Sequence, residues 1–209
     1  PTQLTCRSSG QTMSRSSAIR ENAGMAGEQI GEAVLNCALA QAQGIWGARL
    51  LGAFALGSLA HGGFSALVSD VDLGLLLEDP IGEEDASRVA RLSKQVTASG
   101  LDLAGRLSVF WGSPSTLRGD ASAGRFPPLD RLDLIRYGRL LAGADARAGL
   151  PEPSYRELVL PAAEMGLNLL QRLAQPEDLV ASGPRPLTKA VLFPVRFLYT
   201  ARTGDIGRN

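Results

Sequence analysis

The chain has few cysteines, a single histidine, no net charge and no long apolar run. Two cysteines, Cys6 and Cys37, are too few for a disulfide framework, so a reducing cytoplasm is the expected compartment. Lys plus Arg and Asp plus Glu both total 21, and this balance argues against wholesale nucleic-acid binding, which needs a basic surface. No stretch approaches the roughly 18 apolar residues of a membrane span, and none reads as a signal peptide.

The 209 residues suffice for one or two domains with a buried core. We expect residues 1–18, rich in Ser, Thr, Gln and Gly, to form a flexible tail. Residues 19–128 are expected to form a first α/β domain, and residues 129–209 a helical one that is cut short at its end. The start at Pro1 rather than Met also suggests a fragment.

Apolar periodicity predicts the elements of both domains. In the first domain it predicts helices over 19–43 and 83–99, and buried strands over 49–56, 71–77 and 106–111. In the second it predicts helices over 129–137, 153–173 and 187–203, with a short extended piece over 139–141 and a Gly/Pro break over 182–186. Pro194 is expected to kink the last helix or delay its start.

The most informative stretch reads GSLAHGGFSALVSDVDLGLLLEDP and begins at Gly57. Asp70 and Asp72 open an apolar strand at positions i and i+2, so they share one face. Two carboxylates on one face repel each other unless a cation lies between them. Carboxylate oxygens suit Mg²⁺, which shares phosphate oxygens as ligands. The pair therefore predicts a magnesium site, with Asp70 and Asp72 as metal ligands and catalytic residues.

The Gly57-Ser58 turn ahead of the two acids is suited to a phosphate. Glycine lets backbone N–H groups approach a phosphate closely because no Cβ intervenes, and Ser58 adds a hydroxyl at the start of a short helix. Phosphoryl and nucleotidyl transfer need positioning and charge neutralisation more than covalent chemistry from the protein. The turn and the two acids together favour that chemistry.

These residues resemble the nucleotidyltransferase superfamily typified by DNA polymerase β. The pattern GSxxxGxxSxxSDxDL is filled by Gly57-Ser58, Gly62, Ser65, Ser69 and Asp70-Val71-Asp72, and the segment from Leu129 to Asp145 is also similar. Within the superfamily the chain looks most like the small bacterial kanamycin and streptomycin nucleotidyltransferases, or a minimal nucleotidyltransferase.

The resemblance implies an α+β fold: a small mixed sheet flanked by helices, followed by a helical C-terminal domain. It implies transfer of a nucleoside monophosphate, with AMP from ATP expected, to a hydroxyl of a small molecule or protein. Mg²⁺ would be held by the two aspartates, and Gly57, Ser58 and Ser69 would contact the nucleotide. Lys189, at the start of the last helix, could also reach the triphosphate but is more simply a solvated lysine.

One departure from the family pattern concerns the third carboxylate, which the family places on the next core strand. Here that strand, 106–111, carries no acid. Asp102, just before the strand, and Glu164, on a later helix, are the two substitutes that the sequence offers. The alternative function is therefore a catalytically weak or inactive nucleotide-binding protein, antitoxin-like or regulatory.

Several residues and partners stay open at this stage. His61, the single histidine, could be a catalytic base but is more simply a loop-packing residue. Acidic side chains at Glu152, Glu157 and Glu164 could meet a polycationic acceptor. A nucleoside triphosphate and an unknown acceptor are the expected partners, with a second copy of the chain or a toxin-type protein as further candidates.

Overall fold

The computed structural model describes residues 15–120, 122–173 and 176–207. Its strands are β1 (Leu50–Leu56), β2 (Val71–Leu77), β3 (Leu107–Gly112) and β4 (Arg139–Gly143). Its α-helices are α1 (Arg15–Trp46), α2 (Ser58–His61), α3 (Glu83–Thr97), α4 (Pro114–Arg118), α5 (Pro128–Tyr137), α6 (Tyr155–Leu173), α7 (Pro176–Ala181) and α8 (Pro184–Thr203). Of the expected tail, residues 1–14 lie outside the described residues, and residues 15–18 already belong to α1.

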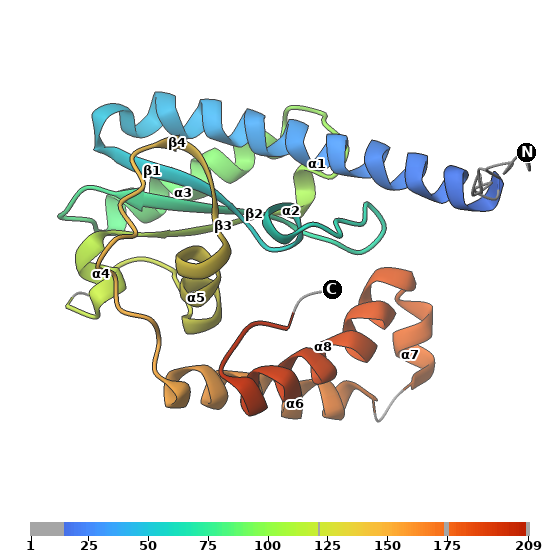
Figure 1. The fold of residues 1–209 in the computed structure, drawn as a ribbon. Helices are drawn as coiled ribbons and strands as arrows, with labels where there is room; N and C mark the ends of the chain where they lie inside the picture. Colours follow the sequence, from blue (N-terminus) through green and yellow to red (C-terminus); the bar gives the residue numbers. More distant parts are fainter. Residues whose placement is uncertain (1–14, 121, 174–175, 208–209) are drawn as a thin grey trace, which may run out of the picture.

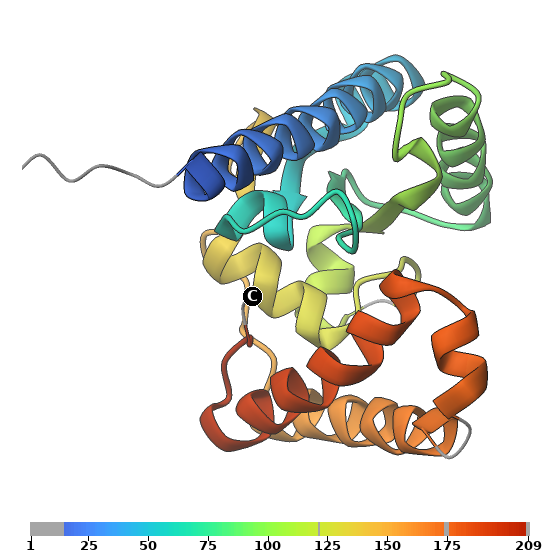
Figure 2. The same ribbon diagram turned by 90° about the vertical axis from the view of Figure 1, so that its right-hand side faces the viewer.

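The four strands form one mixed sheet in the order β3-β2-β1-β4. Strand β1 runs antiparallel to both β2 and β4, whereas β2 and β3 are parallel. Helices α1 and α3 cover one face of the sheet, and α5 lies on the other face, toward a group formed by α6, α7 and α8 (Figure 1 and Figure 2). The predicted α+β fold, a small mixed sheet flanked by helices, is therefore confirmed.

Alternation along the strands sorts side chains between the two faces. Ala53 and Ala55 of β1 join the core beneath α1 and α3, whereas Phe54 and Leu56 pack into a second cluster with Leu134 of α5. The same period places the odd-numbered residues of β2 under α1 and turns its even-numbered residues toward α5. Any functional side chain at an even position of β2 must therefore face α5.

Some predicted boundaries were wrong. Strand β4 pairs with β1, so the sheet extends past residue 129 and the helical part of the chain begins at α6. Helix α8 starts at Pro184 and continues through Pro194 without a break. The Gly/Pro cluster before it was interpreted as a loop, but a proline in the first turn of a helix gives up an N–H that has no intrahelical partner. Helices α4 and α7 were not predicted.

A buried carboxylate ties α3 to the end of α1. Asp85 is 3% exposed and accepts hydrogen bonds from Trp46 Nε1 at 2.9 Å and from Arg49 Nη1 at 3.0 Å. Although burial raises the pKa of this carboxyl, the bonds from Arg49 and Trp46 leave it below its ordinary value. Asp85 is therefore a structural anchor of the sheet-covering helices.

Replacing this anchor should weaken the fold. For Asp85→Asn we expect a loss of about 2 kcal/mol in the free energy of unfolding, because hydrogen bonds to a charged group are replaced by weaker ones. For a chain of this size the melting temperature should fall by about 4–8 °C. Thermal denaturation followed by circular dichroism measures this, and an unchanged melting temperature would contradict the role given to Asp85.

In the part of the chain that the structure describes, no helix is both long enough and apolar enough to cross a membrane.

Candidate active site

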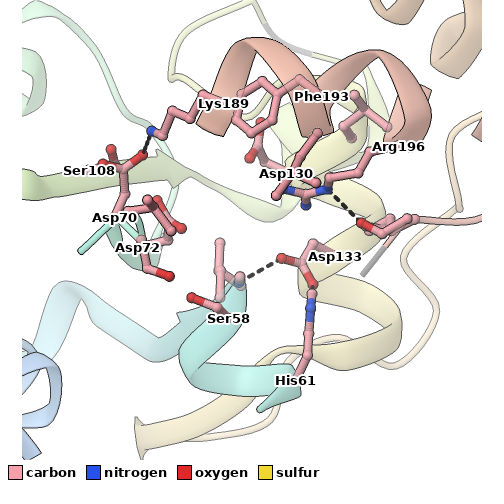
Figure 3. A pocket seen from close by; sticks show the side chains of 18 of the residues that line it. Ser58, His61, Asp70, Asp72, Ser108, Asp130, Asp133, Lys189, Phe193 and Arg196 are labelled. Carbon is pink, nitrogen blue, oxygen red and sulfur yellow. Dashed lines mark hydrogen bonds and ion pairs between the residues drawn. The ribbon is translucent and has the colours of Figure 1, made fainter. Parts of the chain in front are cut away.

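A cavity of about 300 Å³ opens between the α5 side of the sheet and helix α8. The segments that line it include the bend after β1, the start of β2, strand β3, helix α5 and helix α8 (Figure 3). The residues expected to act lie together in its wall, namely Gly57, Ser58, Ser69, Asp70, Asp72 and Lys189. Segments more than 100 residues apart in the sequence thus meet at one cavity.

The bend and the acids are adjacent because β1 and β2 pair with Leu56 opposite Asp72. A Cβ built on Gly57 would lie 2.5 Å from Oδ2 of Asp72, and Gly57 has a φ of +59°. Both facts restrict this position to glycine. The side chains of Asp70 and Asp72 lie beside each other and face the cavity, as the i, i+2 spacing predicted (Figure 3).

The two predicted serines have different surroundings. Ser58 begins α2, and its hydroxyl lies on the side of the bend that faces Asp72 (Figure 3). Ser69 is buried, and its hydroxyl accepts a hydrogen bond from the backbone N–H of Ser65 at 3.0 Å. That bond closes the loop leading into β2, so Ser69 fixes the approach to Asp70.

Asp72 is held in an environment that disfavours its charge. Burial raises its pKa to about 6, and the nearby charges of Asp70 and Asp133 add to the effect. Among the described residues no hydrogen-bond donor or cation pairs with it. A half-buried carboxylate without a partner, next to two others, is an arrangement that a divalent cation would stabilise.

The donor set therefore fits Mg²⁺. In the described part of the chain, no group of three or more His, Cys, Asp and Glu side chains could hold a metal by itself. Mg²⁺ usually binds through one or two carboxylates together with water and substrate phosphates, and Asp70 and Asp72 supply that number.

Cations of α8 face these acids across the cavity. Arg185 and Lys189 both form ion pairs with Asp70. Arg196 lines the same cavity, and burial lowers its pKa despite the charges of Asp133, Asp72 and Asp130. The acidic side chains come from the start of β2 and from α5, the cationic side chains come from α8, and the cavity lies between them.

On β3, where the family resemblance led us to look for a third carboxylate, the cavity wall carries a serine. In the parallel pairing of β2 with β3, Ser108 lies opposite Asp72, and it lines the cavity. Neither proposed substitute is there: Asp102 and Glu164 are exposed and are not among the lining residues. Asp130 of α5 does line the cavity, and burial together with Asp72 and Asp133 raises its pKa to about 7.

Sequence reasoning missed Asp130 and Asp133 on α5, and Arg185 and Arg196 on α8. Two weak signals were available. The acids of LDRLD stand three residues apart, so they share a helix face, and Arg185, Lys189 and Arg196 recur at a helical period. Neither signal says which helix face meets the sheet.

Other expectations concerned residues near this site. His61 packs within the fold, and its Nε2 lies 2.5 Å from Oδ1 of Asp133. Glu152 and Glu157, considered as contacts for a polycation, are already paired with Arg136 and Arg131. The acidic character of the cavity therefore comes from the sheet and α5.

The comparisons with known proteins differ between sequence and structure. No family model matches the chain, and no curated protein sequence matches it. Among solved structures the fold is similar to that of a spectinomycin adenyltransferase, AAD(9), from Enterococcus faecialis, which was solved with ATP and spectinomycin. The TM-score is 0.58 at 14% identity, over 84% of this chain and 78% of that one. The likeness shows a nucleotidyltransferase-like fold.

Proposed function

We propose that this protein is a nucleotidyltransferase that moves AMP from ATP to a hydroxyl group of a small polar acceptor. One observation carries the proposal: the Gly57-Ser58 bend, the unpartnered Asp72 and the cationic face of α8 line one cavity. Asp72 lacks a paired cation among the described residues, and the cationic side chains of Lys189 and Arg196 line the same cavity. A magnesium-bound triphosphate satisfies both, because it supplies a metal to the acids and phosphate oxygens to the bases.

Each group then has a role in binding. Ser58 of the bend takes phosphate oxygens, and Asp70 with Asp72 would hold Mg²⁺, which when bound neutralises charge on the phosphates. Lys189 and Arg185 would leave Asp70 for the triphosphate. We assign the reaction to the cytoplasm, as the sparse cysteines favour.

The reaction that these groups serve is an in-line displacement at the α-phosphorus. A bond forms from the acceptor oxygen to phosphorus, and the bond from phosphorus to the bridging oxygen breaks, so that pyrophosphate leaves. The hydroxyl proton must pass to a base. We assign this task to Asp130, because it lines the cavity where Ser108 of β3 offers no carboxylate.

The acceptor class follows from the charge around Asp130. Asp130 projects from α5 into a cavity that also has the rings of Phe193 and Phe197 in its wall. A carboxylate beside aromatic rings suits a hydroxylated ring that carries amino groups. The similar adenyltransferase was solved with spectinomycin, and an aminocyclitol is accordingly the acceptor that we propose to test first.

A second candidate function has one observation in its favour, the serine at position 108. A protein of this fold without an acid on β3 could bind ATP and transfer nothing, acting as a regulatory or antitoxin-like partner of another protein. A toxin-type protein or a second copy of the chain would then be its partner.

The two functions are separated by measuring binding and transfer together. We expect calorimetry to detect ATP binding that requires Mg²⁺, and ATP labelled at the α-phosphate to pass its label to an aminocyclitol. Asp130→Asn should keep ATP affinity within about twofold and lower the transfer rate by about a hundredfold, the usual contribution of a general base.

Each outcome has a definite reading. ATP binding with no labelled product from any aminoglycoside, aminocyclitol or protein acceptor would favour the second candidate. No ATP binding in the presence of Mg²⁺ would overturn both functions. Full transfer by Asp130→Asn would leave the enzyme assignment standing but contradict the role given to Asp130.

A further inference from the structure

A single carboxylate of α5 is attached to both ends of α2. Oδ2 of Asp133 accepts a hydrogen bond from the backbone N–H of Gly57 at 2.8 Å. Its other oxygen, Oδ1, lies 2.5 Å from Nε2 of His61. Because a carboxylate can only accept, His61 donates from Nε2. Ser58 lies between these two attachment points, with Asp133 between the bend and the imidazole (Figure 3).

The bend needs such an attachment because its local conformation is weakly determined. Gly57 has φ +59° and ψ −146°, a region open to glycine and to few other residues. Its carbonyl is held by the N–H groups of Ala60 and His61, both at 3.0 Å. Asp133 holds the remaining polar group, the N–H. The direction in which Ser58 points is therefore set by Asp133, which lies 76 positions from Gly57 in the sequence.

The attachment is buried and continues into the helical part of the chain. Asp133 is 7% exposed. The ring of His61 meets the ring of Tyr137 edge-on, with centroids 5.4 Å apart. The hydroxyl of Tyr137 donates to Asp205, which follows α8. A chain of hydrogen bonds and one ring contact thus runs from the bend through α5 to the end of the helix that carries Lys189.

This geometry also changes what the bend can offer a phosphate. The N–H of Gly57 already donates to Asp133, so Ser58 remains as the phosphate-facing group of the bend. A carboxylate so close to a triphosphate would repel it if charge were the only consideration. The bond to His61 offsets part of that charge and fixes the carboxylate on the bend.

We propose that Asp133 is a positioning residue that fixes the Gly57-Ser58 bend for the triphosphate and shares its carboxylate between Gly57 and His61. The role toward a triphosphate rests on the proposed function, whereas the contacts of Asp133 with Gly57 and His61 do not depend on it. Asp133 acts through Ser58 and touches neither the acceptor nor the reacting atoms. Losing it should weaken ATP binding more than it slows the chemical step.

Kinetics and calorimetry on the whole chain test the nucleotide part. For Asp133→Ala we expect the Kd for ATP with Mg²⁺ and the KM for ATP to rise about tenfold or more, the usual loss for a hydrogen bond to a charged group. The kcat at saturating ATP should stay within about threefold. Asp120→Asn, which changes an exposed aspartate paired with Arg118, is the control and should match the wild type.

Conservative variants of His61 give a second readout. Gln carries its amide nitrogen about as far from the backbone as Nε2 of histidine, and it can donate to Asp133. His61→Gln should therefore bind ATP more tightly than His61→Leu, which cannot donate. Equal affinities in these two variants would contradict the sharing of the carboxylate.

Amide hydrogen exchange tests the geometry without any nucleotide. The Gly57 N–H should exchange at least about tenfold faster in Asp133→Ala than in the wild type, because its acceptor is gone. Unchanged exchange would overturn the inference even if the protein is a nucleotidyltransferase. ATP binding by Asp133→Ala that is as tight as in the wild type, or tighter, would also overturn it. Failure of the wild type to bind ATP would instead overturn the proposed function.

Discussion

Asp72→Asn is expected to lower nucleotidyl transfer by about a thousandfold while the protein stays folded. The substitution keeps the shape of the side chain but removes half of the paired charge proposed to hold Mg²⁺, and loss of transition-state charge stabilisation has effects of this size. Initial rates with labelled ATP at saturating Mg²⁺ measure it. Wild-type turnover in this variant would contradict the assignment of Asp72 as a metal ligand.

The same variant should be more stable than the wild type without metal. Burial raises the pKa of Asp72 to about 6, so the folded state holds a proton more tightly than the unfolded state, where the pKa is about 3.9. The ionised form is thus destabilising, and this cost grows as the pH rises from about 4 through 6. Asparagine carries no such cost.

Thermal melts at pH 7 in a chelating buffer should therefore show a melting temperature about 2–4 °C higher for Asp72→Asn, which corresponds to about 1 kcal/mol. The difference should shrink at pH 5, where Asp72 is largely protonated. Asp120→Asn should show neither effect, because Asp120 is exposed. A lower melting temperature for Asp72→Asn would mean that the carboxylate stabilises the fold and is not an unpaired metal ligand.

Gly57→Ala is expected to destabilise the fold and to abolish transfer. Alanine would have to adopt a φ of +59°, at a cost of about 1–3 kcal/mol, and its Cβ would lie 2.5 Å from Oδ2 of Asp72. The carboxylate must then move away from the bend. We expect a melting temperature at least about 6 °C lower and no measurable transfer.

Gly62→Ala is the matched control for this prediction. Gly62 also has a positive φ, +84°, but a Cβ there would meet no atom within 4 Å. Gly62→Ala carries the backbone cost of a positive φ without a steric contact. The difference in melting temperature between the two alanine variants therefore measures the effect of the contact between Cβ at position 57 and Asp72. In an Asp72→Ala background that difference should largely vanish. Equal losses in both variants would show that backbone strain alone accounts for the effect.

Much of the sheet could be predicted because its signals are local. The strands around Ala53 and Leu75 were found from short apolar runs, and the alternation of side chains placed Asp70 and Asp72 on one face. The length of α8 was harder to predict because a Gly/Pro cluster that reads as a loop occupies its first turn. Strand β4 was interpreted only as a short extended piece, since nothing local showed that it would pair with β1.

The candidate site was harder to predict from the sequence than the sheet. Two substitutes for the missing acid, Asp102 and Glu164, were considered, and both are exposed. Asp130 was overlooked because an aspartate near the start of a helix is usually a solvated charge. Its environment depends on the packing of α5 against the sheet, which no window of sequence around it contains.

The sequence by itself determined the glycine-serine bend, the two strand acids and the faces that each element presents, because these follow from backbone geometry over a few residues. Only the tertiary structure decided which faces meet. It brought Lys189 to Asp70 across 119 positions and Asp133 to Gly57 across 76. Such pairings depend on how whole elements bury their apolar surfaces, so they arise from the packing of the chain as a whole.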